Sequence, residues 1–164
     1  MKINHQHILT INSGSSSIKF ALYAWDENLK KIFSGEIKRI GLSNPEFKVT
    51  NYISNEKNKI LINAINFKEA AEVLMEWLKK QPSFGQVGCI GHRIVHGMEH
   101  TRPEMIDEKL IKQLRAISKY DPDHLPTEIE LIELFKKQFP EISQFACFDT
   151  SFHTGMPRVA KILP

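Results

Sequence analysis

The first third of the chain alternates apolar and polar residues, as the strands of a half-buried sheet do. Strands are predicted over residues 8–11 and 18–23, on either side of a turn rich in glycine and serine. A third strand is expected over 31–37, with weaker ones over 47–50 and 59–62. Because short turns join these segments, they indicate a mostly antiparallel sheet.

Farther along the chain, apolar residues recur at the spacing typical of helices. Helices are predicted over 68–80, from a cap at Asp107, and from Thr127, which stands in capping-box spacing to Glu130. Short buried strands are expected over 87–90 and 145–148, and a loop over 120–126 because of its two prolines. The antiparallel start is thus followed by alternating helices and strands.

This order predicts an α/β fold with a mixed sheet covered by helices on both faces. Ligands of such sheets usually bind at the ends of the strands. Asn12, Arg93 and Asp149 all lie just past predicted strands and are therefore candidate site residues. No internal repeat or linker interrupts the sequence, so residues 1–164 are expected to form a single domain.

Composition and charge exclude several classes of partner. The 22 basic and 19 acidic residues are scattered and leave a formal charge of +3, so nucleic acid is not expected as a partner. No stretch reaches the ~20 apolar residues of a membrane span, and the start has no secretory core. Cys89 and Cys147 lie in apolar segments, which favours buried free thiols and a cytoplasmic protein.

Residues 12–19 (Asn-Ser-Gly-Ser-Ser-Ser-Ile-Lys) carry groups that can hold phosphate oxygens. A glycine lets the backbone approach a ligand, and hydroxyls, an amide and a lysine follow. The segment turns between two strands and lacks the spacing of a Walker loop. An ordinary hairpin turn explains the same residues, so spacing alone leaves both interpretations open.

Residues 91–97 (Gly-His-Arg-Ile-Val-His-Gly) place Arg93 at the mouth of a buried strand, where its planar fork could bind a carboxylate or a phosphate. A metal site made by His92 and His96 is disfavoured. Their spacing serves zinc on a helix, whereas the β-branched residues between them favour extended chain. A structural or supporting role is expected for both histidines.

Residues 148–153 (Phe-Asp-Thr-Ser-Phe-His) place a carboxylate where a strand emerges. Asp149 could hold magnesium or its waters, or orient a reacting carboxyl group, but a turn or N-cap aspartate is an equally good explanation. Ser15, His153 and Asp149 could also compose a serine hydrolase. This alternative is weak because the serine segment lacks the second glycine of G-x-S-x-G and does not join a strand to a helix.

Together, the segments 12–19, 91–97 and 148–153 closely resemble three signature segments of the acetate kinase family, in the same order and with similar spacing. The resemblance covers the whole chain but only the first part of a family member. The family belongs to the sugar kinase, Hsp70 and actin (ASKHA) superfamily, in which two ribonuclease-H-like domains close on ATP. The resemblance therefore implies an N-terminal acetate kinase domain without the C-terminal ATP-binding domain.

The resemblance also implies roles for individual residues. Direct transfer of the phosphoryl group from ATP to acetate, giving acetyl phosphate, would depend on positioning and charge neutralisation. Mg²⁺ (or Mn²⁺) is the implied cofactor. The implied residues are Asn12 for the metal, Ser15, Ser17 and Lys19 for the ATP phosphates, Arg93 and Val95 for the substrate, and Asp149, Arg93 and His124 for catalysis.

Two departures from the family pattern concern the substrate pocket. Asp123 stands where a pocket leucine is usual, so either its loop is displaced or the preferred acid is not acetate. Met98 stands where a second glycine is usual. A kinase for propionate or butyrate therefore remains an alternative.

The apolar end of the sequence, residues 160–164, resembles a chain cut mid-path. The isolated chain is expected to be inactive and compatible with a monomer, whereas full-length family members are usually homodimers. A non-catalytic phosphate- or carboxylate-binding domain, or a remnant of an enzyme, is the remaining alternative.

Overall fold

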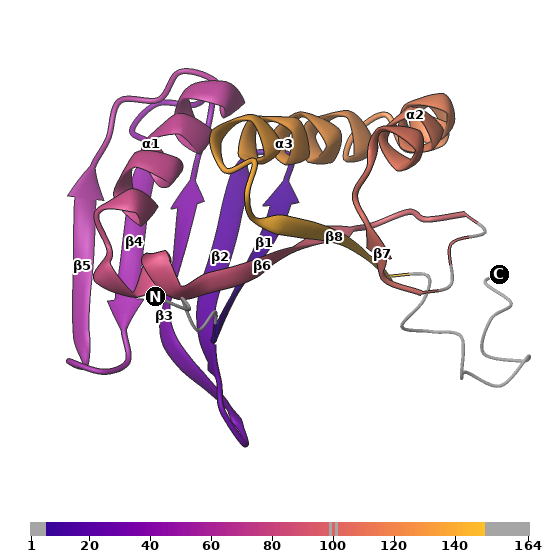
Figure 1. The fold of residues 1–164 in the computed structure, drawn as a ribbon. Coiled ribbons are helices and arrows are strands. Elements are labelled where there is room, and N and C mark those ends of the chain that lie inside the picture. Colours follow the sequence, from indigo (N-terminus) through magenta and orange to yellow (C-terminus); the bar gives the residue numbers. More distant parts are fainter. Residues whose placement is uncertain (1–5, 99, 101, 150–164) are drawn as a thin grey trace, which may run out of the picture.

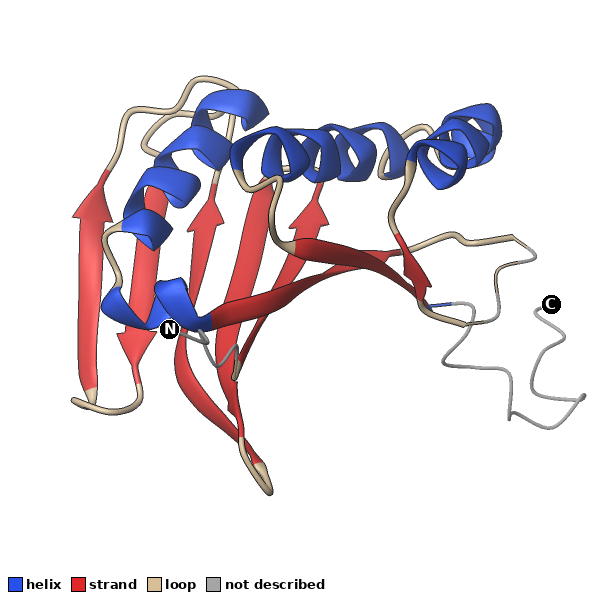
Figure 2. Ribbon diagram, in the orientation of Figure 1, coloured by secondary structure: helices blue, strands red, loops and turns tan. Residues whose placement is uncertain are grey.

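The computed structural model describes residues 6–98, 100 and 102–149 as one eight-stranded sheet with three α-helices packed on it (Figures 1 and 2). The strands are β1 (His7–Gly14), β2 (Ser17–Trp25), β3 (Leu29–Lys38), β4 (Glu46–Asn51), β5 (Glu56–Leu61), β6 (Val87–Ile94), β7 (Glu104–Met105) and β8 (Ser143–Phe148). The helices are α1 (Phe67–Lys79), α2 (Glu108–Ile117) and α3 (Leu125–Gln138), with 3₁₀ turns η1 (Pro82–Gln86) and η2 (Ser118–Tyr120).

The sheet is mixed, as predicted, in the order β5-β4-β3-β2-β1-β6-β8-β7. Strands β1 to β5 pair antiparallel with their neighbours, and β1, β6 and β8 run parallel. The short β7, which no pattern predicted, closes the far edge antiparallel to β8. β1 joins the two halves, because Ile11 pairs with Phe20 on one side and with His92 on the other.

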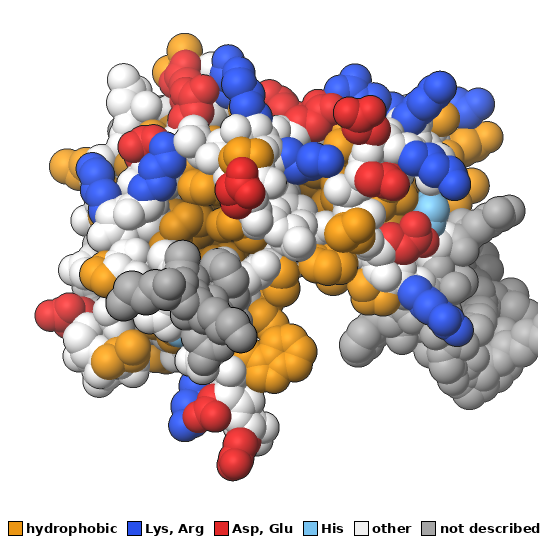
Figure 3. Space-filling view, viewed as in Figure 1, with side chains coloured by type: hydrophobic (Ala, Val, Ile, Leu, Met, Phe, Trp, Pro, Cys, Tyr) orange, Lys and Arg blue, Asp and Glu red, His pale blue; other side chains and the backbone are white. Residues whose placement is uncertain are grey.

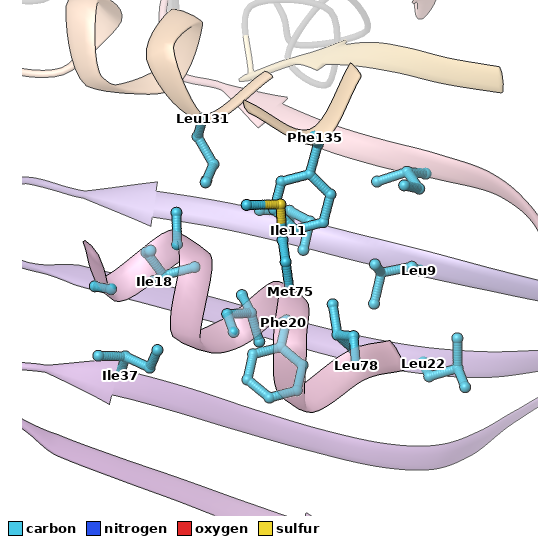
Figure 4. Close-up of a cluster of buried hydrophobic side chains, with 14 of the residues drawn as sticks. Leu9, Ile11, Ile18, Phe20, Leu22, Ile37, Met75, Leu78, Leu131 and Phe135 are labelled. Atoms are coloured by element: carbon cyan, nitrogen blue, oxygen red, sulfur yellow. The ribbon is translucent and has the colours of Figure 1, made fainter. Parts of the chain in front are cut away.

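The main hydrophobic core lies between one face of the sheet and the helices α1 and α3. Leu9 and Ile11 of β1 meet Leu78 of α1 and Phe135 of α3 in this layer (Figure 4). Four aromatic side chains pack beside them with ring centroids 5.1 to 6.1 Å apart: Phe20, Phe33, Phe47 and Trp77. A second cluster packs α2 and α3 onto the ends of β6 and β8.

Of the two helix caps that the sequence predicted, one is confirmed and the other is wrong. Asp107 caps α2 as predicted, since its Oδ1 accepts from the Leu110 N–H at 2.7 Å. The cap predicted at Thr127 is wrong, because α3 already begins at Leu125 and His124 precedes it without a side-chain cap. Pro126 is tolerated there since the first turn of a helix needs no N–H from it.

All three described helices cover the same face of the sheet, either directly or, for α2, beside α3 (Figures 1 and 2). On the opposite face, no helix is found within residues 6–98, 100 and 102–149. Cys89 and Cys147 alternate onto that face. Both thiols are free as expected, but Cys147 is exposed and Cys89 half-buried, so the prediction that both are buried is wrong.

Charged side chains of both signs lie on the face of the molecule that Figure 3 shows. Figure 3 shows basic and acidic side chains mingled over the helices on the face in view. None of the described helices is long and apolar enough to cross a membrane.

Candidate functional site

The structure brings three predicted site residues together at one edge of the sheet. The Arg93 Nε donates to both carboxylate oxygens of Asp149, at 2.9 and 3.1 Å, and Nη2 donates to Oδ2 at 2.6 Å. Arg93 Nη1 donates to Asn12 Oδ1 at 3.3 Å. Asn12 and Asp149 are 81 and 56 positions from Arg93 in the sequence. The hydrogen bonds to Asp149 raise the pKa of Arg93, which stays protonated.

The parallel pairing of β1, β6 and β8 explains this meeting, because parallel strands end at the same edge of a sheet. Asp149 follows β8 as predicted. Asn12 and Arg93 were expected just past their strands but lie inside β1 and β6, which run longer than the apolar segments indicated. Polar residues continue these strands because that face is open to solvent.

The glycine- and serine-rich segment is a tight hairpin between β1 and β2. Gly14 pairs with Ser17, and Ser15 is exposed in the turn between them. The register sets Lys19 opposite Asn12 on the open face, with Lys19 Nζ 3.8 Å from Glu36 Oε1. The serine-hydrolase alternative is not supported at Ser15, since the turn joins two strands and is not a strand-to-helix elbow. Its third residue, His153, lies outside the described residues.

A cavity of about 340 Å³ lies on the open face beside Arg93. The strand register stacks its lining in two layers. Small or apolar side chains (Thr10, Ala21, Gly91) form one layer, and Asn12, Lys19 and Arg93 form the next. Cys147 completes the wall. Amide and cationic groups that converge above an apolar floor are suited to an anion with a small apolar part.

His92 takes no part in this arrangement because it points to the covered face. Its Nε2 lies 2.8 Å from Gln144 Oε1, and its ring packs edge-on against Phe135. Burial lowers the pKa of His92 to about 4, so the ring is neutral at physiological pH. His96 lies past the end of β6, and no group of three metal-binding side chains occurs among the described residues. His92 is therefore structural.

The chain that leaves β6 is tightly held. Val95 is half-buried, and a Cβ on Gly97 would lie only 2.5 Å from Cδ1 of Phe148. Only glycine therefore fits at 97 without movement of the core. Met98 has φ +51°, in the left-handed region, which explains why glycine would suit this position and why methionine is strained there.

Two further residues of interest stand at the start of α3. His124 is half-buried, and its carbonyl oxygen accepts from the Glu128 N–H at 3.0 Å. Asp123 is exposed, so it does not bring a buried charge to the pocket. Of the two explanations for the Asp123 departure, its exposure favours a displaced loop over a changed preference for the acid.

Sequence reasoning missed Glu128. This carboxyl group is 2% exposed and accepts from the Val95 N–H at 3.2 and 3.4 Å. Burial, more than any other cause, raises its pKa to about 7. The available signal was its position, since Glu128 interrupts the apolar stripe that Leu125, Ile132 and Phe135 define on α3.

Comparison with known proteins decides the family. The family model described as the Acetokinase family matches residues 7–164 of this chain. The chain belongs to the acetokinase family. Among curated members, it is 37% identical over 153 residues to acetate kinase 2 of Listeria monocytogenes, covering 91% of this chain and 38% of that protein. It is 35% identical over 158 residues to the acetate kinase of Oceanobacillus iheyensis, covering 94% of this chain and 39% of that protein.

Solved structures agree with this membership of the acetokinase family. The fold superposes on a propionate kinase from Francisella tularensis with a TM-score of 0.82 at 30% identity, covering 93% of this chain and 39% of that one. An acetate kinase from Porphyromonas gingivalis superposes with a TM-score of 0.79 at 25% identity, again covering 93% of this chain and 39% of that one. The predicted fold class is confirmed. The chain spans about two fifths of the length of these relatives.

Proposed function

We propose that this chain forms the substrate-side part of an acetokinase-family enzyme that transfers a phosphoryl group from ATP to acetate or a similar short-chain carboxylate. The observation that carries the proposal is the convergence of Arg93, Asp149 and Asn12 beside a small, partly apolar cavity. Arginine binds carboxylates and phosphates through two parallel hydrogen bonds, and here Asp149 occupies that fork. A substrate anion would exchange with Asp149 for Arg93.

The roles proposed for the residues are those that the family resemblance implies. Arg93 binds the substrate carboxylate or the phosphoryl group in transfer, and Val95 borders the apolar part of the acid. The released Asp149 acts as the catalytic acid and orients the reacting groups, and His124 at the start of α3 assists. Lys19, Ser15 and Ser17 line the path of the ATP phosphates. Charge neutralisation by such groups is the main contribution that proteins make to phosphoryl transfer.

Mg²⁺ or Mn²⁺ is proposed as the cofactor, with ATP as co-substrate. The described residues fit a site completed by the ligand, because Asn12 and Asp149 supply two oxygen donors and Mg²⁺ commonly takes the rest from phosphates and water. The metal would neutralise charge on the phosphate oxygens. Asn12 would then turn its amide oxygen from Arg93 toward the metal.

The setting of the reaction is also proposed, from the family. The full-length relatives are more than twice as long as this chain, and we propose that the adenosine site lies in the part of their length that this chain does not cover. We propose a cytoplasmic enzyme that acts as a homodimer at full length, and no activity for residues 1–164 alone.

The test is to trap acyl phosphate with hydroxylamine from ATP and Mg²⁺ with acetate, propionate or butyrate in turn. It compares residues 1–164 with the polypeptide encoded by the complete reading frame. Acyl hydroxamate from the complete polypeptide alone is expected. Its absence with every acid would leave a phosphate- or carboxylate-binding domain without kinase activity. The preferred acid also tests the likeness to the propionate kinase of Francisella tularensis.

A further inference from the structure

Glu128 is a buried carboxyl group at the end of β6, the strand that carries Arg93. It lies in the first turn of α3 and is 2% exposed. Both of its oxygens face the backbone N–H of Val95, at 3.2 and 3.4 Å. Val95 follows the last residue of β6 and stands two positions after Arg93. The contact therefore ties the start of α3 to the strand end that presents Arg93.

Charged groups from three places in the fold act on Glu128. Arg93 of β6 favours its ionised form, as does the Val95 N–H. Asp121, ahead of α3, and Asp149, after β8, favour the neutral form, and burial does so most strongly. The outcome is a pKa raised to about 7. Glu128 therefore exchanges its proton within the physiological range.

The charge of Glu128 shifts the balance around Arg93, to which Lys19 of the cavity adds a positive charge. Arg93 and Asp149 alone form a neutral pair. With Glu128 ionised, the three groups carry one net negative charge, which opposes the approach of an anion. With Glu128 protonated, that opposition is absent, and its remaining acceptor oxygen can still bind the Val95 N–H.

We propose that Glu128 is a positioning residue that holds the Arg93-bearing end of β6 through the Val95 amide and, by its charge, sets how strongly Arg93 attracts an anionic substrate. The holding role depends only on the geometry of Glu128 and Val95. The effect on substrate rests on the proposed function of Arg93.

The first experiment follows the Val95 amide and the Arg93 Nε–H by ¹⁵N NMR in residues 1–164 between pH 5 and pH 9. Both resonances should move with one midpoint near neutral pH. Glu128→Gln, which keeps an oxygen acceptor but no charge, should abolish the movement. The matched control Glu130→Gln, an exposed position on the same helix, should keep it. Resonances that stay still in the unchanged chain, or still titrate in Glu128→Gln, would overturn the proposal.

The second experiment measures KM and kcat for the carboxylate in the complete polypeptide at pH 6 and pH 8.5. KM should rise by about three- to tenfold with pH in the unchanged enzyme and stay level in Glu128→Gln. A structural role alone would not remove this pH dependence, and its persistence in Glu128→Gln would refute the charge effect. If no acid gives acyl phosphate, the proposed function fails, while the NMR titration still decides the role of Glu128.

Discussion

The two faces of the central strands β1, β6 and β8 have different surroundings and different chemistry. One face packs under α1 and α3, where Ile11, Ile90 and Ala146 are buried. No helix of the described part of the chain covers the other, which bears Asn12 and Arg93. Since side chains alternate along a strand, a single segment supplies both the packing of one face and the chemistry of the other.

The two faces also differ in whether their ionisable side chains are buried or paired in contact with solvent. Beneath the helices, burial lowers the pKa of His92 to about 4 and raises that of Glu128 to about 7, so both favour their neutral forms. On the open face, Arg93 and Asp149 are partly exposed and charged, and they neutralise each other. Substitutions on the covered face should therefore change stability most, and those on the open face should change function most, with Glu128 expected to affect both.

The largest expected effect on stability comes from the buried Glu128. Its pKa is about 7 in the folded chain against an ordinary value of 4.5, so its contribution to stability is retained below pH 4.5 and lost as pH rises through 7. The loss amounts to about 3 kcal/mol. Urea unfolding should show Glu128→Gln gaining about that much relative to the unchanged chain between pH 4.5 and pH 8.

The buried His92 makes this comparison against the unchanged chain necessary. Its pKa is lowered from 6.5 to about 4, so its contribution is present above 6.5 and lost as pH falls through 4, with the opposite slope. The His92 contribution is the same in the unchanged chain and in Glu128→Gln, so it cancels in the difference between their unfolding free energies. A Glu128→Gln difference that does not change with pH would show that Glu128 is not buried as described.

Two glycines, one on each face, should differ in how much an added methyl group changes stability. Gly97→Ala places a methyl group against the ring of Phe148 and should cost about 2 kcal/mol of unfolding free energy. Gly91→Ala, on the open face, meets only Cys147 Sγ at 3.7 Å and should change stability by about 0.5 kcal/mol or less. Thermal unfolding of the two variants checks this, and equal losses would contradict the difference in packing.

Met98 tests whether the backbone of the turn after β6 is strained. Met98→Gly should stabilise the chain by about 1 kcal/mol, because glycine accepts φ +51° without a steric penalty. Asn44→Gly is the control, since Asn44 has φ +58° but asparagine tolerates that region. The gain at 98 should exceed that at 44 in denaturant titrations, and a loss at 98 would rule out strain.

A small effect on stability is also expected from the ion pair on the open face. Asp149→Asn removes the charge opposite Arg93 but should lower the free energy of unfolding by only about 0.5 kcal/mol, because partly exposed ion pairs contribute little. Urea unfolding at low and high salt measures it. A loss of several kcal/mol would mean that the pair supports the fold instead of a ligand.

The sequence predicted the mixed sheet and the meeting of Asn12, Arg93 and Asp149, because strand periodicity and polar residues at strand ends are local signals. It did not predict where the polar ends of β1 and β6 stop, since a strand with one open face tolerates polar residues. It also missed Glu128, because a glutamate on a helix is usually exposed and the Val95 N–H that holds it comes from 33 positions away.

The start of α3 was mispredicted for a similar reason. Thr127 offers the local signature of a cap, but burial of Leu125 extends the helix past it, so tertiary packing outweighs the capping preference. The sequence also could not show that the described helices cover only one face of the sheet. The apolar runs at Cys89 and Cys147 look the same whether helices cover one face or both.

The most direct test of the open face as the reaction centre compares two arginines in the complete polypeptide. Arg93→Ala removes the fork at the cavity, whereas Arg115→Ala removes an exposed arginine that pairs with Glu133 at 2.6 Å on the helices. Acyl hydroxamate formation should fall by about 10²-fold or more for Arg93→Ala and stay within about twofold for Arg115→Ala. Equal activity of the two variants would contradict the account.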